Sequence, residues 1–226
     1  MLLGASFLFW IFFLILGITF FYFPEIDIWF SSLFFRDGEF YLRNQWFVQF
    51  VYDATHPAVA IFFLTVLGML IYALIRHKKP FNLNKRMLVF MLAAIIMAPG
   101  VVVNLTLKDN VDRARPKQIT QFGGDKQFTP AFVISDQCES NCSFVCGHAA
   151  AGFSFIALAM VFKGRRKQWI FYSAVAAGFL IGLVRIIQGG HFLSDVFFAL
   201  FFTYITIRLL YYLIVERFTE LYEKTL

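Results

Sequence analysis

The chain has 226 residues, of which 60% are hydrophobic, 20% aromatic and only 15% charged, and its mean hydropathy is +0.70. Soluble domains are about half apolar and about one quarter charged, so this composition excludes an ordinary soluble enzyme, and the aromatic content excludes a disordered chain. We therefore expect a multi-pass membrane protein that forms a single domain over residues 1–226.

Six apolar runs predict membrane-spanning helices, because each is close to the ~20 residues that cross ~30 Å of hydrocarbon. They cover residues 5–23, 57–75, 87–107, 147–162, 169–187 and 191–215. No positively charged segment precedes the first run and no clear cleavage site follows it, so it is predicted to be a retained anchor. The predicted fold class is all-α, a six-helix transmembrane bundle with an outer loop region between the third and fourth helices.

Much of the positive charge lies in two short loops between apolar runs, residues 76–86 and 163–167. Short loops rich in Lys and Arg face the cytoplasm, so both termini are predicted to be cytoplasmic. Residues 24–56, 108–146 and 188–190 then lie on the opposite side, which is the periplasm in a bacterial inner membrane. A short interfacial helix is expected within 24–56. The basic loops that orient the chain in the membrane thus explain the net charge of +6, and no nucleic-acid partner is expected.

The remaining ionisable residues gather at the outer ends of the predicted helices. They are Lys108, Arg113 and Arg115 after the third run, His148 in the fourth, Arg185 in the fifth, and His191 and Asp195 in the sixth. A charge inside a bilayer costs ~2.5–3.5 kcal/mol on insertion scales, so several together indicate a site. Consecutive antiparallel helices with short loops pack as a bundle, which would bring these side chains together.

This set of side chains favours phosphate chemistry. Guanidinium and ammonium groups suit a tetrahedral dianion, and the start of the fourth helix adds the unpaired N–H groups of Gly147 and His148. His191 and Asp195 are four residues apart and would share one helical face, where the carboxylate accepts the Nδ1–H and leaves Nε2 free as a nucleophile. A protonated His148 would donate to the leaving oxygen. The expected reaction is phosphoryl transfer through a phosphohistidine, followed by attack of water.

Three ordered motifs resemble those of the type 2 phosphatidic acid phosphatase (PAP2) superfamily. They are Lys108-(six residues)-Arg115-Pro116, Cys146-Gly147-His148, and Arg185-(five residues)-His191-(three residues)-Asp195. The resemblance implies the six-helix fold and a reaction without a metal ion or other cofactor. The roles it implies are phosphate binding by Lys108, Arg115, Arg185, Cys146 and Gly147, general acid for His148, nucleophile for His191, and orientation of that nucleophile by Asp195.

Two positions depart from the family pattern. Cys146 stands where the family has Ser, and Val184 stands where it has Ser before the Arg. A thiol is a poor hydrogen-bond partner for phosphate, so we expect position 146 to contact the phosphate through its backbone rather than its side chain.

Residues 130–148 resemble the lipid A 4′-phosphatase branch of the superfamily. The resemblance implies hydrolysis of a lipid phosphomonoester at the periplasmic face, with the 4′-phosphate of lipid A as the favoured substrate. The alternatives are undecaprenyl pyrophosphate, phosphatidylglycerophosphate or phosphatidic acid, or transfer of the phosphoryl group to another acceptor. An anion transporter is a different class and is disfavoured, because the charges gather at one membrane face only. The sequence does not predict the oligomeric state.

Three cysteines lie at positions 138, 142 and 146. Their spacing is not the usual Cys-x₂-Cys of zinc sites, and no fourth ligand is evident, so a disulfide in an oxidising compartment is favoured. Cys138–Cys142 is the first choice, with Cys142–Cys146 and Cys138–Cys146 left open. A phosphocysteine mechanism is rejected, because position 152 is Gly rather than the Arg that would close a phosphate loop.

Several further charged or titratable residues are assigned to less specific roles. Arg113 has no counterpart in the motif and is predicted to be an interfacial anchor, or a contact for a second substrate charge. His56 and His77 are predicted to be loop residues rather than ligands. Lys117 and Lys126 lie in the outer loop, where they could meet a sugar-bound phosphate.

Overall fold

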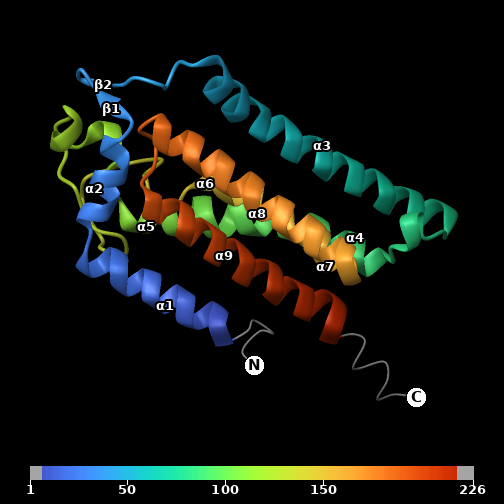
Figure 1. Cartoon of the computed structure of the whole chain (residues 1–226). Helices are drawn as coiled ribbons and strands as arrows, with labels where there is room; N and C mark the ends of the chain where they lie inside the picture. Colours follow the sequence, from blue (N-terminus) through green and yellow to red (C-terminus); the bar gives the residue numbers. More distant parts are fainter. Residues whose placement is uncertain (1–6, 218–226) are drawn as a thin grey trace.

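The computed structural model describes residues 7–217, without the side chains of residues 104–107 and 109. Residues 5 and 6, where the first predicted span begins, lie outside this part of the chain, as do both chain termini. The described residues form long helices with similar axis directions, and irregular segments gather at one end of them (Figure 1).

Helices form in each of the predicted apolar runs. In chain order they are α1 (Phe7–Tyr22), α2 (Glu25–Ser32), α3 (Trp46–Arg76), α4 (Lys85–Ile96), the π-helical η3 (Met97–Leu107), α5 (Lys108–Val111), α6 (Gly147–Phe153), α7 (Ile156–Met160), α8 (Gly164–Ile187), α9 (Leu193–Tyr211) and η6 (Tyr212–Glu216). Short 3₁₀ turns are η2 (Pro80–Asn82), η4 (Pro116–Gln118) and η5 (Thr120–Phe122). A small hairpin pairs β1 (Phe35–Arg36) with β2 (Glu39–Phe40) around two residues of positive φ, Asp37 and Gly38.

Within the described residues, four helical segments are long and apolar enough to cross a membrane. They are α3, the α4–η3 segment, α8 and the α9–η6 segment. Helix α1 passes the same test only together with α2, and the two are bent by 84° at Pro24, which cannot continue α1. The run at 147–162 instead forms α6 and α7, two short helices whose residues are mostly buried. The chain is therefore an all-α multi-pass membrane protein with four or five candidate spans, where six were predicted.

Helix α3 begins at Trp46, well before residue 57, where its apolar run starts, so it includes His56 and Pro57. The prediction that His56 lies in a loop is therefore wrong. A proline inside a membrane helix is tolerated because neighbouring groups satisfy the freed backbone carbonyl. Trp46 is 78% exposed, as expected of an aromatic residue in the interfacial belt. His77 ends the helix in a left-handed conformation and does lie in a loop.

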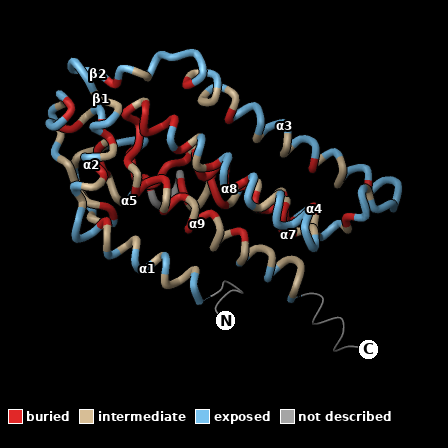
Figure 2. Tube along the Cα trace, viewed as in Figure 1, coloured by how far each residue is buried: buried red, intermediate tan, exposed pale blue. Residues whose placement is uncertain are grey.

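The short helices α6 and α7 lie inside the bundle, where small residues allow neighbouring helices to approach closely. A Cβ built on Gly152 of α6 would be 2.8 Å from the Cα of Gly178 in α8. A Cβ built on Gly178 would be 2.1 Å from the Phe153 ring. Close contact between small residues is the main packing device for helices in a bilayer. Figure 2 shows that buried residues concentrate in this inner layer and toward the end that carries the irregular segments.

Aromatic rings fill the contact between α1 and α9. Phe13 meets Phe201 edge-to-face with ring centroids 5.1 Å apart, and it meets Phe198 at 5.9 Å. Such pairs contribute about 0.5–1.5 kcal/mol beyond the burial of their area. This packing holds α1 against the bundle and so positions the start of α2.

The two ends of the bundle carry different kinds of connecting segments. The basic loops 76–86 and 163–167 lie at one end, with the beginning of α1 and the end of η6 (Figure 1). Helix α2, the β1–β2 hairpin and α5 lie at the other end. The ends of α8 and the starts of α6 and α9 meet there, so the motif residues are brought to one end of the molecule.

Replacing Gly178 by Ala is expected to destabilise the protein, because the added methyl group meets the Phe153 ring. Overpacking of this kind costs about 1–3 kcal/mol, against a gain of ~1 kcal/mol when Ala replaces Gly in a helix. Gly68→Ala in α3 is the matched control, because nothing lies within 4 Å of a Cβ there. Thermal unfolding in detergent should show a lower midpoint for Gly178→Ala alone, and equal midpoints would contradict the close packing of α6 on α8.

Candidate active site

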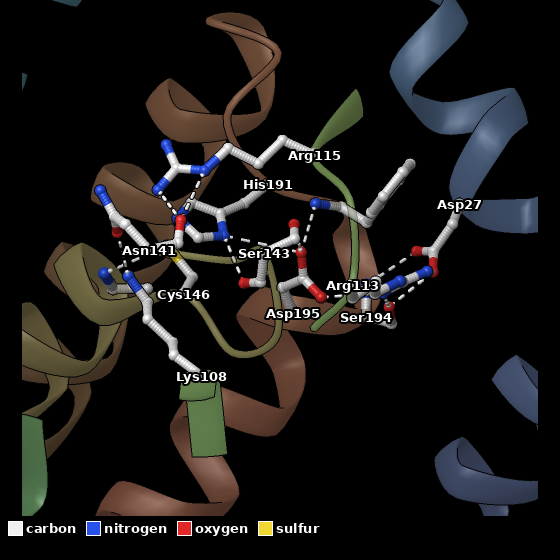
Figure 3. A network of polar contacts seen from close by, with 12 residues as sticks. Asp27, Lys108, Arg113, Arg115, Asn141, Ser143, Cys146, His191, Ser194 and Asp195 are labelled. Carbon is white, nitrogen blue, oxygen red and sulfur yellow. Dashed lines mark hydrogen bonds and ion pairs between the residues drawn. The ribbon is translucent and has the colours of Figure 1, made fainter. Parts of the chain in front are cut away.

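Lys108 and Arg115 both bind the same residue of the outer segment, Asn141. Lys108 Nζ donates to Asn141 Oδ1 at 3.0 Å. Arg115 donates to the Asn141 carbonyl oxygen from Nε at 3.0 Å and from Nη2 at 2.5 Å. Lys108 begins α5, and Arg115 immediately precedes Pro116 and the turn η4, where the chain reverses. Two of the predicted phosphate-binding residues therefore lie side by side (Figure 3).

Arg185, the third predicted phosphate-binding cation, is buried in the last turn of α8. Its guanidinium group donates to Gln188 and lies 4.7 Å from the centroid of the Tyr52 ring of α3. Gly190 leaves room for this side chain, because a Cβ at that position would be 2.6 Å from Arg185 Nη2. The glycine therefore allows the close approach of the turn to the guanidinium group.

These three cations bind neutral acceptors, and in the part of the chain that the structure describes none of them forms an ion pair. Burial lowers the pKa of Lys108, and the charge of Arg115 lowers it further. The pKa of Arg115 is lowered by burial and then by Arg185. Lys108, Arg115 and Arg185 therefore lie close enough together for their charges to repel one another. Like charges held together away from water cost free energy that a bound anion would offset.

His191 lies in the turn after α8 and not on α9. The helix begins at Leu193, because the Asp195 carboxylate accepts the backbone N–H of Phe192 at 2.8 Å and closes the first turn. The prediction that His191 and Asp195 share a helical face is therefore wrong. His191 Nδ1 instead donates to the Ser143 carbonyl oxygen at 2.8 Å. A bond to a carbonyl fixes the tautomer and leaves the Nε2 lone pair free.

Asp195 contacts His191 mainly through Ser143. Asp195 Oδ2 is 3.6 Å from His191 Nδ1, too far for a good hydrogen bond, and accepts from Ser143 Oγ at 2.6 Å. Burial lowers the pKa of His191 to about 3, against the opposing effect of Asp195. The ring is therefore neutral at physiological pH, as a nucleophile requires.

Asp195 is also one end of a buried ion network. Arg113 Nη1 lies 2.8 Å from Asp195 Oδ1, and Arg113 Nη2 lies 2.8 Å from Asp27 Oδ2, with all three side chains 0% exposed. Ser194 donates to Asp27 from its hydroxyl at 2.5 Å and from its backbone N–H at 2.8 Å. Figure 3 shows the network running from His191 to α2. The prediction for Arg113, as an anchor or a substrate contact, is wrong because two carboxylates occupy its guanidinium group.

Asp27 and Ser143 are missing from the residues that sequence reasoning assigned to the site. Asp27 could have been found from the sequence. It is a carboxylate inside the predicted interfacial helix, and a charge among apolar neighbours needs a partner. Ser143 carries no such signal, because it contacts His191 through its backbone carbonyl, a group that every residue has. The same holds for the Asn141 carbonyl.

His148 is the second residue of α6 and packs against two rings of α3. It stacks on Tyr52 with ring centroids 4.8 Å apart, and His56 meets it edge-on at 4.7 Å. Its Nε2 is buried and has no hydrogen-bond partner in the described residues. A buried imidazole nitrogen without a partner is available to exchange a proton with a ligand. Sequence reasoning missed Tyr52 because aromatic residues are abundant throughout this chain.

A cavity of about 500 Å³ opens beside His148, between α3, the α4–η3 segment and α6. Lys108, Asn141, Gly147 and His148 form its polar part. The rest is lined by His56 and by apolar groups, namely Val59, Ile95, Ile96, Pro99, Gly100 and Ala151. This combination of a cationic end and an apolar groove suits an amphiphile with a phosphorylated headgroup.

Cys146 is the N-cap residue of α6. Its Sγ accepts the Ala149 N–H at 3.4 Å, and its own N–H donates to the Asp195 carbonyl at 3.1 Å. Burial raises the pKa of the thiol to about 11, so it stays protonated. The side chain and the N–H of Cys146 are thus both occupied, so the prediction that residue 146 contacts phosphate through its backbone is wrong. The N–H groups of Gly147 and His148 have no acceptor inside the helix.

Cys138 and Cys142 form a disulfide bond, and Cys146 is free and buried. The two paired thiols are unavailable to a metal ion. Asn141 lies inside the small loop that the disulfide closes, in a left-handed conformation with φ of 51°. The disulfide therefore restrains the residue that Lys108 and Arg115 bind.

Comparisons with known proteins point to one family. The sequence model of the PAP2 superfamily matches residues 88–219. A lipid A 4′-phosphatase of Francisella tularensis subsp. novicida is 39% identical over 219 residues, which is 95% of each chain. Proteins of the same name from Rhizobium etli and Rhizobium leguminosarum are 35% and 31% identical over 84% of this chain, and over 79% and 87% of their own lengths. No solved structure gives a significant match.

Replacing Asp27 by Asn keeps the shape of the side chain but removes the charge that pairs with Arg113. We expect kcat to fall by about tenfold to 100-fold with little change in KM, because Asp195 must then balance Arg113 alone and the Ser143–His191 contact shifts. The measurement is steady-state release of phosphate from a phosphorylated lipid.

Ser31→Ala is the matched control for Asp27→Asn, because Ser31 lies in the same helix and its buried hydroxyl has no hydrogen-bond partner in the described residues. It should leave kcat unchanged. A wild-type kcat for folded Asp27→Asn would show that the network serves stability alone.

Replacing Cys146 by Ser is expected to keep activity and to raise the thermal midpoint slightly, since a hydroxyl oxygen is a better acceptor than sulfur for the Ala149 N–H. Cys146→Val removes the cap and should cost about 0.5–2 kcal/mol. Unfolding midpoints and phosphate release measure both variants. Loss of activity in a stable Cys146→Ser protein would give the thiol a chemical role that capping does not explain.

Proposed function

Because the chain belongs to the PAP2 superfamily, we propose that it is an integral-membrane lipid phosphatase that hydrolyses the 4′-phosphate of lipid A. The family supports phosphoester hydrolysis. The relatives at 31–39% identity, all named lipid A 4′-phosphatase, support the substrate and the position of the phosphate. The Francisella protein aligns with 95% of this chain, so the likeness includes the outer segments that shape the site.

One observation carries the proposal: three cations that form no ion pair among the described residues gather near His191, whose Nε2 lone pair is left free by the bond from Nδ1. In a structural ion network the cation is paired with carboxylates, as Arg113 is with Asp27 and Asp195. The charge of the site is instead available to a phosphate dianion. Guanidinium groups bind two phosphate oxygens at once, which would orient the phosphorus toward His191.

The reaction follows from the placement of the two histidines. His191 Nε2 attacks the phosphorus in line, the N–P bond forms, and the bond to the sugar oxygen breaks. A protonated His148 gives that oxygen its proton and becomes a neutral imidazole. It then takes a proton from water, and the water oxygen forms a bond to phosphorus as the N–P bond breaks, which releases inorganic phosphate and returns the Nε2 lone pair to His191. Lys108, Arg115 and Arg185 stabilise the negative charge on the equatorial oxygens in both steps.

The cavity beside His148 supports a lipid as the substrate. Its polar part adjoins Lys108 and His148, and its apolar part runs along α3 and α4, where an acyl chain can lie. A soluble phosphate ester would gain nothing from burial against Ile95 and Ile96. The headgroup would reach the cations while the chains stay in the hydrocarbon.

In this proposal the site opens at the periplasmic face of a bacterial inner membrane. The basic loops 76–86 and 163–167 lie at the opposite end of the bundle, with the beginning of α1 and the end of η6, and would face the cytoplasm (Figure 1). The α6–α7 segment then crosses the membrane inside the bundle, and α1 crosses beside it, which makes six crossings. The disulfide on the same side as the site suits an oxidising periplasm.

The direct test incubates the purified protein in neutral detergent with lipid A and locates the lost phosphate by mass spectrometry. We expect release of the 4′-phosphate by the wild type, with or without EDTA, and no release by His191→Ala, which lacks the nucleophile. Vanadate should inhibit, because it mimics the five-coordinate phosphorus. The same assay on phosphatidic acid, phosphatidylglycerophosphate and undecaprenyl pyrophosphate ranks the alternatives.

His77→Ala is the control for His191→Ala, because His77 lies in the loop after α3 at the other end of the bundle. It should release phosphate at the wild-type rate. Turnover by folded His191→Ala would remove the nucleophile from the mechanism, and loss of the 1-phosphate instead of the 4′-phosphate would correct the position.

A further inference from the structure

A second pocket, of about 180 Å³, adjoins the reaction centre and shares no residue with the larger cavity. The residues that line it include Arg43, Gln49, Tyr52, Lys117, Arg185 and Gln188. Tyr52 and Arg185 connect the two regions, because His148 stacks on Tyr52 and the Arg185 guanidinium lies over the same ring. The mechanism above uses Arg185 alone among the charged groups of this pocket.

Two cations of the pocket, Arg43 and Lys117, come from different outer segments and are held beside it through the backbone. Gln49 Nε2 donates to the Arg43 carbonyl oxygen at 2.6 Å. The Lys117 N–H donates to the Gly189 carbonyl at 3.1 Å, which ties Lys117 to the turn that carries His191. Within residues 7–217, neither side chain forms an ion pair or a hydrogen bond, and both are exposed.

The positive charge around Arg185 exceeds what one phosphate group needs. A phosphomonoester carries about −1.5 to −2 charge at pH 7. The three phosphate-binding cations already balance it, and the nearby carboxylates of the buried network are taken by Arg113. Arg43 and Lys117 bring the number of cations to five. Burial lowers the pKa of Lys117, as do Arg115 and Arg43, so these charges repel one another until an anion binds.

We propose that this pocket binds a second anionic group of the substrate headgroup, a phosphate or a carboxylate, while the phosphate to be hydrolysed lies at His191. The inference rests on the proposed function and adds a requirement to it: the preferred substrate carries two anionic groups. A lipid with one phosphate on a small headgroup, such as phosphatidic acid, fills the reaction centre and leaves Arg43 and Lys117 without a counter-ion.

The test compares Arg43→Ala, Lys117→Ala and the double variant on three substrates in neutral detergent, which supplies no anionic lipid. The substrates are lipid A with both phosphates, 4′-monophosphoryl lipid A, and the monophosphoryl form extended by a carboxylate-bearing sugar. For the double variant we expect KM to rise about tenfold on a substrate with a second anion, and to stay unchanged on the 4′-monophosphoryl form. Comparison of the first and third substrates shows whether the second anion is a phosphate or a carboxylate.

Arg36→Ala is the matched control for Arg43→Ala. Both are exposed arginines of the same outer segment, but Arg36 lies over the Tyr41 ring and does not line the pocket. It should leave KM unchanged on all three substrates.

Equal effects of the double variant on all three substrates, or no effect on any, would overturn the second anion site. Failure of the wild type to release phosphate from any of them would refute the proposed function instead. The two failures are therefore distinguishable in one set of assays.

Discussion

The paired charge of Arg113 holds the outer end of this bundle together. A guanidinium group buried as completely as this one needs partners, because an uncompensated charge at that depth costs several kcal/mol. Its partners come from α2 and α9, so α2 must fold back across the ends of the spans, and the 84° bend after α1 allows this. Asp195 also fixes Ser143, whose carbonyl orients His191. The position of His191 thus depends on α2, a helix near the start of the chain.

The site is defined by the contrast between compensated and uncompensated cations. The charge of Arg113 is compensated inside the protein by two carboxylates, those of Asp27 and Asp195. In the described part of the chain, Lys108 and Arg115 bind the amide and carbonyl oxygens of Asn141, which are weaker partners than carboxylates and can be exchanged for a phosphate oxygen. Holding such cations at the outer ends of membrane helices costs free energy in the empty protein. That cost favours binding of an anion, because the dianion relieves repulsion that is already present.

The sequence predicted the convergence of the motif residues because apolar runs and basic loops determine which helix ends share a membrane face. It predicted the all-α class for the same reason. The run at 147–162 forms the two short helices α6 and α7 instead of one long helix, because small residues such as Gly152 allow a broken helix to be buried in protein rather than in lipid. The prediction that His191 and Asp195 share a helical face was wrong because the Asp195 side chain caps the backbone N–H of Phe192. The helix therefore begins at Leu193, after the start of the apolar run at residue 191. Asp27 and Ser143 act through tertiary contacts that no local pattern encodes.

Selectivity for one phosphate of a lipid cannot come from the reaction centre alone. Three cations and an imidazole bind any phosphomonoester in the same way, so the choice depends on what the rest of the substrate contacts. The apolar part of the larger cavity fixes the depth of the acyl chains, and Arg43 with Lys117 offers a second point of attachment on the headgroup. Two anionic groups bound at separate points fix the rotation of the headgroup as well as its depth. Under the proposed function, this arrangement would present the 4′-phosphate to His191 and hold the other anion away from it.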